Sequence, residues 1–109
     1  MNEEIVAEIR KEYDESLKYI KKLTEVEVTG RSGDEIGPIG QGYYKGIVID
    51  RLRSLQFSFR EYKDSEEFKE IDLKFQKSLA TLVNQVADFY DLQRQQKQSE
   101  ATAWKQSAQ

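Results

Sequence analysis

The segment with the most unusual chemistry is rich in glycine. All six glycines and the only proline lie within residues 30–46, in the run GRSGDEIGPIGQGYYKG. Glycine-rich backbone at the start of a helix can donate N–H groups to a phosphate or carboxylate, and Lys45 would add positive charge. The spacing matches neither the Walker motif nor the dinucleotide-binding motif. The segment therefore favours a connector or a protein-binding loop over an anion site. Its candidate contact residues are Arg31, Ile36, Ile39, Tyr43 and Tyr44.

A series of cationic side chains after this segment is the best candidate for contact with nucleic acid. Arg53 and Arg60 are seven residues apart and would share one face of a helix. Contact with a phosphate backbone needs several such cations on one surface. Asp50 and Glu61 interrupt the series, and the sequence pI of about 5.1 weighs against it. The nucleic-acid candidates are Lys45, Arg53, Arg60 and Lys63.

Catalytic and metal-binding chemistry has few candidates. The sequence contains no histidine and no cysteine, which excludes disulfides, zinc fingers and Ser-His-Asp triads. The carboxylates within 66–70 and at Asp88 and Asp91 could form an acid/base pair only in a cleft. A bundle of 109 residues rarely provides one. We therefore expect no catalytic residue, no cofactor, no metal ion and no enzyme activity.

Three segments with helical periodicity must position these side chains. Apolar residues recur at helical spacing within 3–24, from about 44 to 62, and from 65 to at least 93. Asn2 is the expected N-cap of the first helix. Val26 and Val28 alternate with glutamates, which suggests a short extended stretch. The predicted apolar positions are Val6, Ile9, Tyr13, Leu17, Ile20, Leu23, Val48, Leu52, Leu55, Phe59, Tyr62, Phe68, Ile71, Phe75, Leu79, Leu82, Val86, Phe89 and Leu92.

These elements predict an all-α, antiparallel three-helix bundle with a long Gly-rich loop between the first and second helices. The bundle domain would span 1–93, with the loop at about 26–43. The polar, Gln-rich tail at 94–109 either extends the third helix or is disordered. Acidic and basic segments alternate along the chain, so they could pair within one molecule or between two molecules.

Phe57 lies on the side of the second helix opposite its main apolar seam, together with Tyr43 and Ile47. This second strip has two interpretations. It could be core between two other helices, or it could be a subunit interface, where aromatic anchors concentrate. Phe57 is therefore a further partner-binding candidate.

The sequence as a whole predicts a small, non-enzymatic, protein-binding protein of an adaptor, structural or regulatory kind. The third helix is longer than either helix that could cover it, so we expect a homo-oligomer. The alternative is a small helical subunit that holds nucleic acid within a larger ribonucleoprotein or DNA-processing assembly. Anion binding by the Gly-rich loop ranks third. The acidic N-terminus and the absence of about 18 consecutive apolar residues predict a cytoplasmic protein with no membrane contact.

Overall fold

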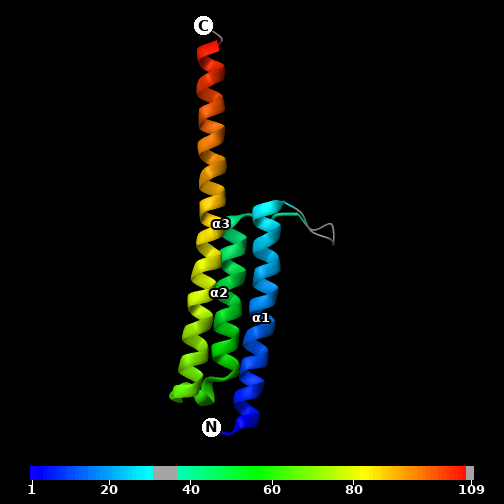
Figure 1. Ribbon diagram of the computed structural model, residues 1–109, viewed down its shortest axis with the longest axis vertical. Helices are drawn as coiled ribbons and strands as arrows, with labels where there is room; N and C mark the ends of the chain where they lie inside the picture. Colours follow the sequence, from blue (N-terminus) through cyan, green and yellow to red (C-terminus); the bar gives the residue numbers. More distant parts are fainter. Residues whose placement is uncertain (31–36, 108–109) are drawn as a thin grey trace.

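The computed structural model describes residues 1–30 and 37–107, with side chains described as far as Trp104. It contains α1 (Glu3–Thr29), α2 (Gln41–Ser58), the short 3-10 helix η1 (Arg60–Tyr62) and α3 (Glu66–Ser107). The three α-helices run up, down and up and pack side by side (Figure 1). The predicted all-α, antiparallel three-helix bundle is confirmed, and the described residues contain no strand.

α1 begins as predicted and ends later than predicted. The Asn2 side chain accepts a hydrogen bond from the Ile5 N–H at 2.9 Å, which satisfies one of the unpaired donors at the helix start. The extended stretch expected at Val26 and Val28 is wrong, because the helix continues through both residues. It ends at Gly30, whose φ of 69° is left-handed and whose N–H bonds the Val26 carbonyl at 2.8 Å. Glycine adopts this conformation without the penalty that a Cβ brings.

α2 begins at Gln41, earlier than the expected start near Tyr44. The connection between α1 and α2 therefore spans 30–40, and the predicted interval of about 26–43 was too wide at both ends. Arg31 and Ile36 lie outside the described residues.

α3 is a single helix of 42 residues that includes the described part of the predicted tail. Gln, Lys, Ala and Glu predominate there, and these residues favour helix even without packing partners. Of the two alternatives for the tail, helical extension therefore holds as far as Ser107.

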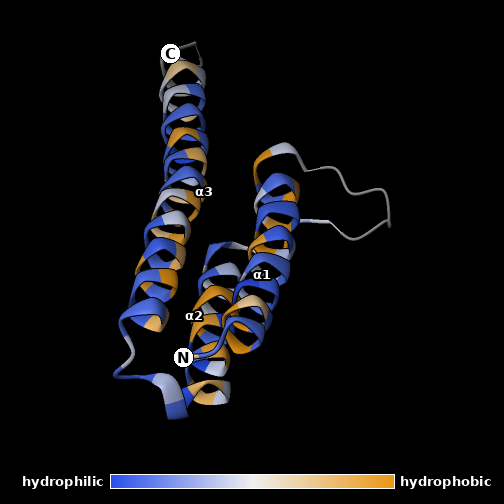
Figure 2. Ribbon diagram, turned by 60° about the horizontal axis from the view of Figure 1, so that its bottom comes forward, coloured by the Kyte–Doolittle hydropathy of each residue, from blue (hydrophilic) through white to orange (hydrophobic). Residues whose placement is uncertain are grey.

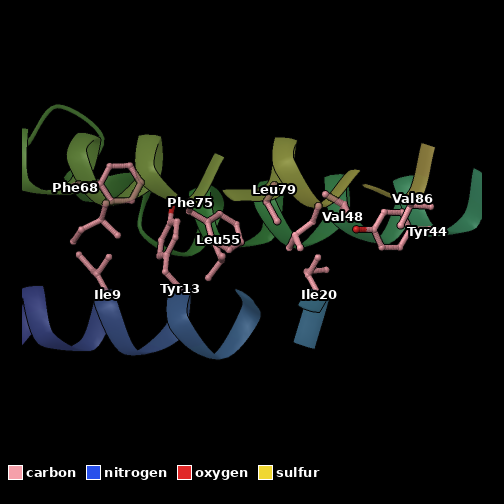
Figure 3. Packing of buried hydrophobic residues seen from close by; sticks show 12 residues of the cluster. Ile9, Tyr13, Ile20, Tyr44, Val48, Leu55, Phe68, Phe75, Leu79 and Val86 are labelled. Carbon is pink, nitrogen blue, oxygen red and sulfur yellow. The ribbon is translucent and has the colours of Figure 1, made fainter. Parts of the chain in front are cut away.

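The core runs along the axis of the bundle, between α1 on one side and α2 and α3 on the other (Figure 3). Tyr13 of α1 belongs to this core, with its ring edge-to-face against Phe75 at 5.0 Å and Phe68 at 6.1 Å between centroids. Such pairs add to the stabilisation from area burial. The buried hydrophobic residues are Ile9, Tyr13, Ile20, Tyr44, Val48, Leu55, Phe68, Ile71, Phe75, Leu79, Leu82 and Val86.

α3 extends well beyond the other two helices (Figure 1). The molecule measures 72 × 28 × 16 Å, and the stretch 91–107 alone is about 25 Å long at 1.5 Å per residue. We call this stretch the arm. Leu92, predicted to belong to the apolar face, is 57 % exposed because it lies on the arm. Hydrophilic residues predominate along the arm (Figure 2).

Candidate functional site

The Gly-rich connection ends at a helix N-terminus that already holds a carboxylate. Glu27, near the end of α1, accepts hydrogen bonds from the backbone N–H groups of Ile39 at 2.7 Å and Gly40 at 3.0 Å. These groups precede the first turn of α2, where the helix dipole favours negative charge. The side chain of Glu27 thus occupies the position at which the sequence suggested a bound anion.

Glu27 also joins α1 to α3. Its Oε1 atom accepts a hydrogen bond from the Tyr90 hydroxyl at 2.8 Å, and only 1 % of the Glu27 residue is exposed. One turn earlier, the Thr24 and Tyr44 hydroxyls are 2.6 Å apart. We call Thr24, Glu27, Tyr44 and Tyr90 the upper cluster. It connects all three helices at the end of the bundle from which the arm projects.

A second buried carboxylate connects the three helices lower in the bundle. Asp72 of α3 accepts hydrogen bonds from the Tyr13 hydroxyl at 2.6 Å, the Gln76 amide at 2.6 Å and the Gln56 amide at 3.1 Å. Tyr13 belongs to α1 and Gln56 to α2. We call these four residues the lower cluster.

Burial and the neighbouring carboxylates shift the pKa values of three tyrosines upward. Burial is the main cause in each case, since it disfavours the charged phenolate. The hydrogen bond and negative charge of Asp72 raise the pKa of Tyr13 further, and those of Glu27 do the same for Tyr90. For Tyr44, burial and the charge of Glu27 raise the pKa, while the hydrogen bond with Thr24 opposes the shift. All three hydroxyls remain protonated at neutral pH, and those of Tyr13 and Tyr90 donate to Asp72 and Glu27.

The buried polar atoms of the two clusters are fully hydrogen-bonded within the chain. Every buried side-chain nitrogen or oxygen among the described residues has a hydrogen-bond partner. Across the same residues, no group of three or more acidic side chains is placed to hold a metal ion. The carboxylates that the sequence singled out lie at the surface, where Glu66 pairs with Lys69 at 3.6 Å and Asp91 pairs with Arg94. The hydrogen bonds of the two clusters join the helices to one another.

The partner-binding candidates are placed in different environments. Tyr44 is fully buried and belongs to the core. Ile39 is half-buried and held by Glu27. Tyr43 and Phe57 are 77 % and 66 % exposed. The interpretation of Phe57 as core is therefore wrong, while Ile47 packs against the core.

The cationic candidates all lie at the surface of α2 and the turn after it. The Arg60 guanidinium lies 4.2 Å from the centroid of the Phe57 ring and donates to the Phe57 carbonyl at 2.9 Å. Lys45, Arg53 and Lys63 are exposed. None of the four forms an ion pair with another described residue, since both pairs found in that part of the chain lie within α3. Among the described residues, no ion pair joins one helix to another.

The arm is the largest element that the bundle does not cover. Every described residue from Asp91 to Trp104 is exposed. Its two large apolar side chains are Leu92 near the bundle and Trp104 near the far end, and Trp104 is 73 % exposed.

Comparison with known proteins identifies no relative. Neither a family model, nor a curated protein, nor a solved structure matches this chain. The described helices include none that is long and apolar enough to cross a membrane.

The sequence analysis missed both buried carboxylates. Their positions in the helical repeat could have revealed them. Glu27 continues the seven-residue spacing of Tyr13 and Ile20, and Asp72 lies between the buried residues Phe68 and Phe75. Acidic residues at apolar seam positions indicate buried, hydrogen-bonded groups, since an unpartnered carboxylate could not remain there.

Proposed function

We propose that the chain is a non-enzymatic, protein-binding helical protein that self-associates and serves an adaptor, structural or regulatory role. The observation that carries this proposal is the arm. It is a regular continuation of α3, and none of its described residues is buried.

The arm has features of a surface that another protein covers. Most helical stability in proteins comes from tertiary packing of an apolar face, and the bundle gives the arm no such packing. An exposed tryptophan is a frequent anchor of protein interfaces, and Trp104 is the most prominent apolar side chain of the arm. We infer that the arm binds another protein and that the bundle holds it in place.

A non-enzymatic role agrees with the state of the buried carboxylates. Glu27 and Asp72 each accept three or more hydrogen bonds from the chain itself. A general acid or base must instead reach a substrate proton. A cytoplasmic location agrees with the absence of cysteine, because nothing in the fold depends on an oxidising compartment.

The second candidate is a subunit that holds nucleic acid, which the exposed cations at Lys45, Arg53, Arg60 and Lys63 favour. Asp50 and Glu61 lie among them and reduce the positive field, so this candidate ranks below protein binding. Anion binding at the start of α2 ranks lower still, because Glu27 already occupies two of its N–H groups.

Affinity purification from native lysate, with and without nuclease, tests the proposal. The full chain is compared with a chain that ends at residue 91, with Trp104→Ala, and with the matched surface control Gln98→Ala. We expect a protein partner that nuclease does not release, that Gln98→Ala retains, and that truncation or Trp104→Ala loses. Loss of all partners after nuclease treatment supports the nucleic-acid candidate instead. Full retention by the truncated chain contradicts the role of the arm.

A further inference from the structure

The outer face of α2 carries two aromatic side chains that the bundle does not cover. The inner surface of the helix buries Tyr44, Val48 and Leu55. On the other side Tyr43 and Phe57 are largely exposed, and their separation of fourteen residues returns them to nearly the same face. The residues of this outer face follow helical spacing and are Tyr43, Gly46, Asp50, Arg53 and Phe57.

A shallow depression lies beside Tyr43, in the N-terminal half of α2. It is lined by Gly42, Tyr43, Gly46, Ile47 and Asp50. Gly46 lies inside the helix, where glycine is disfavoured relative to every residue except proline. Its φ is not positive, and a Cβ at this position would meet no atom within 4 Å. Neither the backbone nor the packing of the chain therefore requires glycine there.

The charges on the outer face are complementary to those on the same face of a second, antiparallel copy of α2. Asp50 and Arg53 are exposed, have opposite signs and form no ion pair with another described residue. When a second α2 lies antiparallel, with a two-fold axis midway between residues 51 and 52, Asp50 faces the partner's Arg53 and Arg53 faces the partner's Asp50. A parallel arrangement would place like charges together, which is unfavourable.

The same two-fold axis matches the shapes. It places Phe57 of each chain over the depression at Gly46 of the other chain. Each contact occurs twice, as a self-complementary interface requires.

We propose that the outer face of α2 is a homodimer interface, occupied by α2 of a second copy in antiparallel orientation. The inference rests on the self-association in the proposed function and assigns it to residues outside the arm. A single pair of helices is at the small end of specific interfaces, so the dimer forms in the micromolar range.

Sedimentation equilibrium of the full chain between about 1 and 100 μM, a range that brackets micromolar affinity, tests the proposal. Gly46→Gln fills the depression with a residue that favours helix, so the monomer keeps its fold. Asp50→Arg and Arg53→Asp each place like charges together across the axis. We expect each of these variants to raise the dissociation constant by about tenfold or more. Leu73→Gln, at an exposed position of α3, is the matched control and leaves it unchanged.

The double variant Asp50→Arg/Arg53→Asp restores opposite charges across the two-fold axis. We expect its dissociation constant to return to within about threefold of the wild-type value. A mass of 12.8 kDa at every concentration overturns the proposal. Unchanged association in the single variants, or failure of the double variant to recover, also overturns it.

The chain that ends at residue 91 separates this inference from the role of the arm. We expect it to dimerise as the full chain does. Dimerisation lost with the arm and unaffected by the α2 variants would overturn the α2 interface and leave self-association standing. A monomeric chain that still captures its protein partner through the arm would overturn the interface and leave partner binding standing.

Discussion

At the residue scale, two carboxylates determine how the helices fit together. Asp72 accepts hydrogen bonds from α1 and α2, and Glu27 accepts them from α3 and from the backbone just before α2. A shift of one helix by a turn would remove these donors and leave a buried charge without partners, which is strongly unfavourable. The two clusters therefore select one register among those that the apolar seams alone would allow.

Glu27→Ala tests the upper cluster. The substitution leaves the N–H groups of Ile39 and Gly40 and the Tyr90 hydroxyl without their acceptor. We expect the free energy of unfolding to fall by about 3 kcal/mol or more, given about 1 kcal/mol or more for each of the three part-buried donors left unpaired. Urea denaturation measures the loss. The exposed neighbour Glu25→Ala is the control and should change stability by less than about 0.5 kcal/mol.

The raised tyrosine pKa values predict sensitivity to alkali. Tyr13 ionises near pH 10 when unfolded and only at higher pH when folded, so above pH 10 the native state binds more protons than the unfolded state. The contribution of Tyr13 to stability is therefore constant below about pH 10 and falls as the pH rises further, by up to about 1.4 kcal/mol per pH unit for each such tyrosine. Urea midpoints measured against pH should decline less steeply in Tyr13→Phe. An equal decline in both proteins contradicts the assignment.

At the element scale, periodicity predicted the three helices and nearly all of their buried hydrophobic positions. Phe68, Phe75 and Leu82 are buried as their seven-residue spacing indicates. The helix ends were predicted less well, because they depend on contacts between distant residues. Just before α2, for example, the Gly40 N–H donates to Glu27, thirteen residues earlier in the chain.

The candidate site was less predictable than the helices, because its hydrogen bonds join residues far apart in sequence. Tyr13 and Asp72 are separated by 59 residues, and Glu27 and Tyr90 by 63. Periodicity places each residue on a face of its own helix, but it does not say which residue of another helix lies opposite. The exposure of Phe57 and the burial of Tyr44 depend on the same packing.

Substitution of two glycines by alanine should have opposite effects on stability, because one glycine ends a helix and the other lies inside a helix. Gly30 caps α1 with a φ of 69°, so Gly30→Ala should destabilise the protein by about 1–2 kcal/mol. Gly46 lies inside α2 with open space around it, so Gly46→Ala should stabilise the folded monomer by about 1 kcal/mol. Thermal unfolding at a concentration where the chain is monomeric measures both. The same sign for the two substitutions would contradict this account of the glycines.

At the scale of the whole molecule, the bundle and the arm are separable in stability though continuous in structure. The two polar clusters and the buried apolar residues lie at or before Tyr90. The arm has exposed side chains throughout its described part. The bundle should therefore fold without the arm.

Truncation after residue 91 should leave the unfolding temperature of the bundle within a few degrees. A shift of that size corresponds to less than about 1 kcal/mol for a domain of this length. Circular dichroism follows the transition, and sedimentation velocity should show a more compact particle. A large drop in the unfolding temperature would mean that the arm packs against the bundle in solution.

Because the arm and bundle share one uninterrupted helix, the distance of Trp104 from the bundle and its direction around the α3 axis are linked. Each residue inserted between Tyr90 and Trp104 would move the indole about 1.5 Å outward and turn it by about 100°. An insertion of seven residues would restore nearly the original direction about 10 Å farther away. A binding partner that requires Trp104 to point in one direction would still bind after an insertion of seven residues and would not bind after an insertion of two. A partner that requires only a given distance from the bundle would be affected more by seven residues than by two. The length of the helix thus sets both the distance and the direction at which Trp104 is presented to a partner.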